Sequence, residues 1–190
     1  DYAVENKKMC IKYIKDNFTD ELTSFVDIDF LNEEGLLYLD NDCQKVIDYF
    51  KEKKVDALFI INCNFGNENA AGDVAKALNL PTLLWGPRDR NFSNGLRYTD
   101  TQCGLFAMSK QLKRNNVKFS YIENCDIEND IFTKGLQQFF SVATMVNNFK
   151  NLTIVQVGSR VKPFKSVMCN ELELCEKFGI SISPVNLAEV

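Results

Sequence analysis

Helix-type and strand-type hydrophobic patterns alternate along the whole chain of 190 residues. Apolar residues spaced three and four apart predict amphipathic helices, and short apolar or alternating runs between them predict strands. We expect helices near 4–18, 43–54, 70–78, 100–114, 126–146 and 166–178, and strands near 25–30, 55–61, 81–85, 117–122, 152–157 and 180–185. Such alternation is typical of a parallel sheet with right-handed crossovers. We therefore predict an α/β fold, an open parallel sheet with helices on both faces in a Rossmann-like or flavodoxin-like three-layer arrangement.

The two ends of this pattern bear on domain organisation. The pattern opens with a helix, so we expect the first strand of the fold to lie upstream of Asp1. It stops just after a strand, so we expect the sheet or a second domain to continue downstream of Val190. We predict an N-terminal α/β domain over residues 1–150. Residues 151–190 would be the start of a middle α/β domain or a return strand of the first.

Composition excludes several classes of function. The chain contains no histidine, which removes Ser-His-Asp and Cys-His catalysis and most zinc and transition-metal sites from it. The net charge is −4 with scattered Lys and Arg, which argues against nucleic-acid binding. No apolar run approaches the ~18 residues that span a bilayer. The seven cysteines form no C-x-x-C pair and no signal peptide is visible, so we expect reduced thiols and a cytoplasmic protein.

Polar side chains follow three of the expected strands, where open parallel sheets bind their ligands. Amide side chains donate and accept hydrogen bonds, which suits a polyol. A glycine lets a ligand approach the backbone closely, and an arginine at a strand end can hold an oxyanion or a hydroxyl. The candidate substrate-binding residues are Asn62, Cys63, Asn64, Phe65, Gly66, Trp85, Arg88 and Arg160.

Each candidate also has a purely structural interpretation. Asn and Gly before a helix are common turn and capping residues. Trp85 is the only tryptophan, and its ring would either stack on a sugar or fill the end of the core. Arg88 and Arg160 would otherwise form surface ion pairs, and Cys63 would be a buried, inert thiol. The turn Gly158-Ser159-Arg160 is a weak phosphate signal, because no G-x-G-x-x-G motif is present.

Short motifs from Val55 onward resemble the L-fucose isomerase and L-arabinose isomerase superfamily, in its isomerase-related branch. These motifs are Val55–Glu68, Leu80–Pro87 with its "LPTLLWGP" strand, Gly104–Ala107, Leu152–Arg160 and the final "FGISISPVNLAEV". The loop at Cys63, Asn64 and Phe65 matches the family loop that reaches toward substrate. Cys63 stands where some members have a tryptophan, so Phe65 or Trp85 would take over stacking on a sugar. Arg160 matches a glycine–small–Arg turn of that branch.

The resemblance implies aldose–ketose isomerisation through an enediol, assisted by Mn²⁺ held by Glu, Asp and His residues beyond Val190. It implies no cofactor and no catalytic or metal-binding residue within this chain. The expected partners are a monosaccharide, the rest of the same polypeptide and further copies of the protein, in a trimer or hexamer. We therefore expect an N-terminal fragment of a sugar isomerase that supplies pocket walls and oligomer contacts and is inactive alone. The alternatives are a non-catalytic sugar-binding or sensor domain and a flavodoxin-like or receiver-like domain with no sugar role.

Overall fold

The computed structural model describes residues 2–89, 98–150 and 152–189. The chain forms two compact units, residues 1–140 and 141–190, and the boundary falls inside the fifth helix. The model is α/β with parallel strands, which confirms the fold class predicted from the sequence. No helix in the described part of the chain is long and apolar enough to cross a membrane.

The first unit is built on a parallel sheet of three strands in the order β1-β2-β3. These strands are β1 (Leu58–Ile61), β2 (Thr82–Trp85) and β3 (Phe119–Tyr121). Thr82 lies opposite Leu58 on one side and opposite Phe119 on the other, so β2 is central. All four residues of β2 are buried, as expected for an apolar strand covered on both faces. β1 is left at an edge of this sheet.

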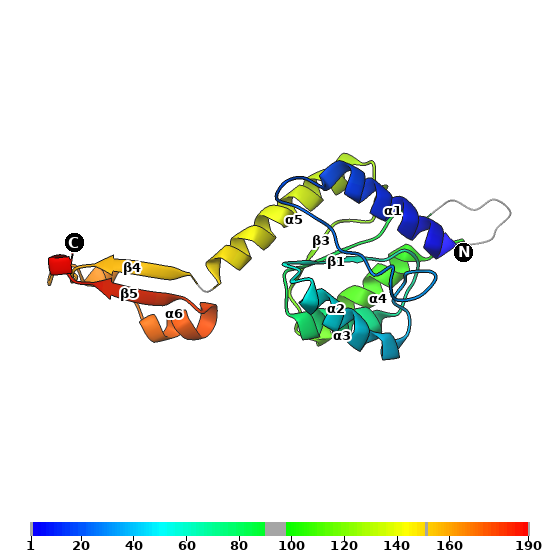
Figure 1. Cartoon of the computed structure of the whole chain (residues 1–190). Coiled ribbons are helices and arrows are strands. Elements are labelled where there is room, and N and C mark those ends of the chain that lie inside the picture. Colours follow the sequence, from blue (N-terminus) through cyan, green and yellow to red (C-terminus); the bar gives the residue numbers. More distant parts are fainter. Residues whose placement is uncertain (1, 90–97, 151, 190) are drawn as a thin grey trace. The chain divides into compact units, whose positions relative to one another are not determined.

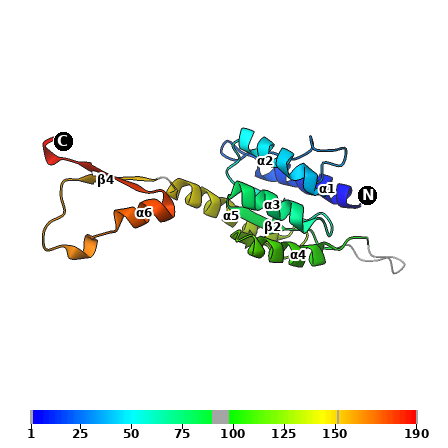
Figure 2. The same ribbon diagram turned by 90° about the horizontal axis from the view of Figure 1, so that it is seen from below.

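Helices cover both faces of this sheet, as the sequence predicted (Figure 1). The helix α1 (Tyr2–Phe18) and the first part of α5 (Asp130–Phe149) lie on one face. The other face carries α2 (Cys43–Glu52), α3 (Glu68–Leu78) and α4 (Thr101–Arg114). Figure 2 shows the same elements from below. A short 3-10 helix (Asp40–Asp42) leads into α2.

Each face of the sheet has its own apolar core. On the α2–α4 face, Leu58, Ile60 and Leu84 pack in one cluster with the inward residues of the helices, which are Val46, Ile47, Phe50, Val74, Ala75, Leu105, Met108 and Leu112. On the α1 and α5 face, the core is aromatic, because the ring of Phe132 contacts those of Phe18, Phe59 and Trp85. Alternate residues of β1 therefore belong to different cores, as the period-2 geometry of a strand requires.

Local chemistry fixes where several helices begin and end. Asn67 caps α3, because its side-chain oxygen accepts the N–H groups of Asn69 and Ala70. Asn79 ends the same helix in the left-handed conformation with φ 50°. Asn is common at a helix start because its side-chain oxygen accepts N–H groups that have no partner within the helix. Asn, like Gly, is common at a helix end because it tolerates the left-handed conformation.

Three expectations about elements were wrong. Residues 25–30 do not form a strand, because this segment has no strand beside it and ends in a turn. The fifth helix begins at Asp130 rather than near Asp126. The side chain of Asn129, not that of Asp126, accepts the N–H of Ile131 at its start. The last helix begins at Glu171 rather than near Ser166, because Asn170 caps it.

The second unit contains a two-stranded parallel sheet of β4 (Thr153–Val157) and β5 (Ser181–Val185). The helix α6 (Glu171–Phe178) connects the two strands, preceded by a 3-10 helix (Lys165–Val167). Another 3-10 helix (Leu187–Glu189) follows β5. Every residue of β4 is exposed. This is a single βαβ unit whose sheet has little apolar surface buried against it.

Candidate functional site

The polar loop that follows β1 is anchored by a buried asparagine. The backbone N–H of Asn62 continues the parallel ladder by donating to the carbonyl oxygen of Trp85 at 2.9 Å. Its side-chain amide donates to the carbonyl oxygen of Phe65 at 3.2 Å, which closes a turn over residues 62–65. Asn62 is 5 % exposed, so its amide holds the loop and is little exposed to a ligand.

Asn64 joins this loop to the start of α4. Its side-chain oxygen accepts the N–H of Asp100 at 2.8 Å and that of Phe65 at 2.9 Å. Two glycines let the segments approach each other closely. A Cβ at Gly104 would lie 2.4 Å from the carbonyl oxygen of Phe65, and one at Gly86 would lie 2.7 Å from that of Asn62. The ends of β1 and β2 and the start of α4 thus form one tightly packed region.

Phe65 and Gly66 are the parts of this loop that face outward. The side chain of Phe65 is 46 % exposed. Gly66 has a φ of +79°, and no atom lies within 4 Å of the position where a Cβ would be. The backbone conformation therefore favours glycine, and the space beside it is open to a ligand. An exposed aromatic ring next to an open glycine suits the apolar face of a sugar.

The thiol of Cys63 is buried and chemically quiet. Cys63 is 8 % exposed, and its Sγ contacts the carbonyl oxygen of Ile61 at 3.6 Å. Burial raises the pKa of this thiol to about 12, although the charge of Lys7 opposes the shift. The structure thus places Cys63 where the structural interpretation expected it, because a neutral, buried thiol is inert.

Trp85 lies in the core of the first unit. Its side chain has no accessible surface, and its ring centroid is 4.4 Å from that of Phe132 and 6.3 Å from that of Phe59. Of the two interpretations that the sequence left open, this geometry matches core packing. Phe65 is then the ring of the two that a sugar can reach.

Arg88 lies at the same edge of the sheet, just after β2. Its backbone N–H donates to the carbonyl oxygen of Cys125 at 3.2 Å. The side-chain amide of Asn124 holds the preceding turn by donating to the carbonyl oxygens of Gly86 and Pro87 at 2.9 and 2.8 Å. The backbone of Arg88 is therefore fixed, and its side chain is exposed.

Asp89 has a structural role that the sequence analysis missed. Its carboxylate accepts the Thr99 hydroxyl at 2.7 Å and the N–H groups of Thr101 and Gln102 at 2.7 and 3.1 Å. Partial burial raises the pKa of this carboxyl, but these hydrogen bonds outweigh burial and hold it below its ordinary value. Asp89 thus stabilises the start of α4 beside the loop. No local sequence pattern indicates this contact, because Thr99 lies ten residues after Asp89.

Arg160 belongs to the second unit. One of its terminal nitrogens donates to the carbonyl oxygens of Val161, Lys162 and Phe164 at 3.1 to 3.2 Å. The guanidinium therefore organises its own loop after β4. Residues 62–66 and 88 meet at one sheet edge of the first unit, whereas Arg160 belongs to the second unit.

Metal binding finds little support in the described residues. No group of three or more Cys, Asp or Glu side chains there could hold a metal ion. The described residues therefore offer no donor set for the Mn²⁺ whose ligands the resemblance places beyond Val190.

The comparison with known families agrees with the resemblance found from the motifs. No curated protein matches this chain. A family model described as fucose/sulfoquinovose isomerase, N-terminal domain, matches residues 1–150, which include the three-stranded sheet and the loop after β1. The match covers well over half of the chain, so the protein belongs to the fucose/sulfoquinovose isomerase family through its N-terminal domain.

Proposed function

We propose that this chain is the N-terminal part of an aldose–ketose isomerase and supplies a wall of the monosaccharide pocket. The observation that carries the proposal is the loop after β1. Partly buried hydrogen bonds of Asn62 and Asn64 hold the loop, and they leave Phe65 and Gly66 facing outward at the carboxyl edge of the sheet. The family match over residues 1–150 supplies the class of reaction.

The residues of this wall bind and orient rather than react. The ring of Phe65 would stack on the C–H face of a sugar, and Arg88 would donate hydrogen bonds to its hydroxyls. Neither group is a suitable base for moving a proton between two carbons, since Phe has no titratable atom and Arg stays protonated. The proton transfer of an enediol mechanism therefore falls to residues other than these two, and in line with the family resemblance we assign it, with binding of Mn²⁺, to the part of the enzyme beyond Val190.

The second unit supports a further part of this proposal. A two-stranded sheet with exposed faces is marginal by itself, and Ile154, Val155 and Val157 are 41 to 58 % exposed. We interpret residues 151–190 as the start of the middle α/β domain, whose remaining elements would cover these side chains. We propose further that the enzyme is a trimer or hexamer, and that this chain also contacts a neighbouring subunit in it.

Steady-state kinetics of the full-length enzyme test the role of the wall. Phe65→Ala removes the stacking ring, and we expect KM for the monosaccharide to rise about two- to tenfold, since aromatic contacts contribute about 0.5–1.5 kcal/mol. Phe30→Ala is the matched control, because Phe30 is 49 % exposed but packs on Tyr49 of α2, away from this loop. Equal KM values for both variants would contradict the proposed wall.

Calorimetry of the isolated chain tests whether it acts alone. We expect weak monosaccharide binding, no aldose–ketose conversion, and no change when Mn²⁺ is added. Conversion by the isolated chain, or a tight Mn²⁺ site in it, would overturn the proposal. Tight sugar binding by a full-length protein without isomerase activity would instead establish the non-catalytic sugar-binding alternative.

A further inference from the structure

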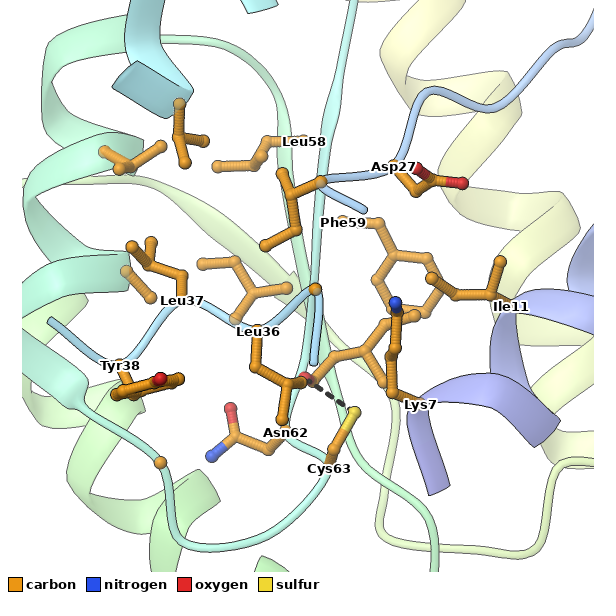
Figure 3. A pocket seen from close by; sticks show the side chains of 18 of the residues that line it. Lys7, Ile11, Asp27, Leu36, Leu37, Tyr38, Leu58, Phe59, Asn62 and Cys63 are labelled. Carbon is orange, nitrogen blue, oxygen red and sulfur yellow. Dashed lines mark hydrogen bonds between the residues drawn. The ribbon is translucent and has the colours of Figure 1, made fainter. Parts of the chain in front are cut away.

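An apolar groove of about 420 Å³ lies in the first unit beside the edge strand β1. It runs between the two helical layers rather than over the surface of either. One wall comes from α1, with Ile11 and Ile14, and the facing wall comes from α2 and α3, with Val46, Phe50 and Val74. Figure 3 shows Ile11 and Phe59 on one side of β1 and Leu37 and Leu58 on the other. The groove therefore occupies the layer of the sheet itself.

The edge of β1 that faces this groove carries backbone groups without a strand partner. The N–H groups of Leu58 and Asn62 donate to Pro81 and Trp85 of the β2 side. In a parallel ladder alternate residues point to opposite neighbours, so Phe59 and Ile61 direct their N–H and C=O groups into the groove. Among the described residues, no backbone hydrogen bond links Phe59 or Ile61 to a segment on that side.

The far side of the groove is formed by two chain segments that do not pair with β1. Residues 25–29 are held to α1 by ion pairs of Lys15 with Asp27 and of Lys7 with Asp29, and residues 25–28 line the groove. Leu36 exchanges hydrogen bonds with the side chain of Asn32 rather than with a strand. These segments stay apart from β1 and leave the width between them open.

The groove selects an extended apolar peptide. The helical walls are mainly apolar, with Lys7 and Lys15 of α1 as their charged members. Side chains on either face of a strand placed there would be buried, which favours a continuous apolar run. Among the described residues, the N–H groups of Phe59 and Ile61 and the carbonyl oxygen of Phe59 have no partner, and they require one with the spacing of a strand. The carbonyl oxygen of Ile61 is already met by the Cys63 thiol at 3.6 Å. A sugar would leave the apolar walls unmatched, and a simple apolar ligand would leave the backbone groups unpaired.

The position of α1 indicates where such a strand comes from. Asn6, in the second turn of α1, donates to the carbonyl oxygen of Cys63 at 2.8 Å, so α1 begins at the carboxyl end of β1. A strand in the groove that runs parallel to β1 would end at the same edge. A short loop of about 2–6 residues, typical of strand-to-helix connections, would then join it to α1.

We propose that the groove is the seat of a strand of about five apolar residues, contributed by the same polypeptide directly before α1. This strand pairs with β1 on one side and with residues 25–28 on the other. The sheet order becomes that of a flavodoxin-like doubly wound fold, whose ligand crevice lies at the switch point between the added strand and β1. The loop of residues 62–66 lies at that point, so the added strand completes the edge on which the proposed site is built.

Amide hydrogen exchange tests the proposal on a chain extended before Asp1 by Val-Ile-Val-Ile-Val-Gly-Asn. We expect the amides of Phe59 and Ile61 to exchange at least about tenfold more slowly in the extended chain than in the unextended chain, because they gain hydrogen-bond partners. The amides of Leu58 and Ile60 already bond to β2 and should change little. Unchanged exchange at Phe59 and Ile61 would overturn the proposal.

Three controls keep the result specific. An extension of Val-Pro-Val-Pro-Val-Gly-Asn has similar apolar character, but each of its prolines lacks an N–H group and does not fit a central strand, so it should give no protection. Ile11→Glu places a carboxylate on the α1 wall and should abolish the protection, whereas Ile131→Glu, at an exposed position of α5, should not. Protection that depends on protein concentration and accompanies a dimer would show a strand from a second copy, and would also overturn the proposal.

Discussion

The side-chain amide of Asn6 donates a hydrogen bond of 2.8 Å to the carbonyl oxygen of Cys63, 57 residues away in sequence. Asn6 is only 3 % exposed. The bond fixes the first part of α1 against the end of β1, where the candidate loop begins. A buried carbonyl without a partner costs free energy. Loss of this contact should therefore destabilise the fold by more than the net contribution of one hydrogen bond.

We expect Asn6→Ala to lower the free energy of unfolding by about 1–3 kcal/mol, because it leaves the Cys63 carbonyl buried and unpaired. Urea denaturation of the isolated chain measures the change. Asn17→Ala is the matched control, since Asn17 lies on the same helix and donates to the carbonyl oxygen of Tyr13, but in an exposed position. Losses of equal size in the two variants would show that the buried contact is unimportant.

Much of the fold could be predicted because its signals are local. The spacing of Cys43, Val46, Ile47 and Phe50 specifies a helix within a single segment, and that helix is present as α2. The apolar run before Asn62 likewise predicts a strand, which is present as β1, although it lies at the edge of the sheet rather than at its centre. Alternation of such segments was enough to predict a parallel sheet with helices on both faces.

The wrong strand expectation has a physical reason, which is that a strand depends on its neighbour. Residues 25–30 alternate apolar and acidic side chains, yet they form no ladder because no strand lies beside them. The candidate site shows the same limit. The hydrogen bond from Asp100 to Asn64 spans 36 residues, and the core position of Trp85 depends on Phe132, so no local pattern could indicate either.

The carboxylate of Asp89 should make the stability of the first unit depend on pH. Its pKa is held below the ordinary value of 3.8 by hydrogen bonds that form only in the folded state. A depressed pKa contributes stability above the ordinary value, and this contribution is lost as the pH falls through the folded value. We expect Asp89→Asn to lower the free energy of unfolding by about 0.3–1 kcal/mol at neutral pH, because it removes a negative charge and one of two acceptor oxygens from the start of α4.

Denaturation of both proteins from pH 7 down to below 3.8 checks this expectation. The difference between the wild-type chain and Asp89→Asn should narrow as the pH falls below 3.8. Glu128→Gln, at an exposed position, serves as the charge-matched control and should change stability little at any pH. A difference that stays constant down to the lowest pH would contradict an ionised Asp89 in the fold.

The burial of Trp85 predicts the fluorescence of the protein, because it is the only tryptophan. With no accessible surface, its emission should be blue-shifted, resistant to quenching by iodide, and unchanged by added monosaccharide. Trp85→Ala should cost about 3–5 kcal/mol of stability, as for other large-to-small changes in a core. Quenching by iodide in the folded protein, or a shift on sugar addition, would show that the ring is at the surface.

The two units should differ sharply in amide hydrogen exchange. Leu83 and Leu84 lie in the central strand of the first sheet and have no exposed surface, so their amides should open only with global unfolding. Val155 is 58 % exposed in a two-stranded sheet, and such sheets are marginal in water. In the isolated chain we therefore expect the amides of β4 and β5 to exchange at least about tenfold faster than those of β2.

In the full-length enzyme the remaining elements of the proposed middle domain would cover β4, and this difference in exchange rate should shrink. Equal protection of both sheets in the isolated chain would show that residues 141–190 are stable without further elements, and would contradict their interpretation as the start of a second domain.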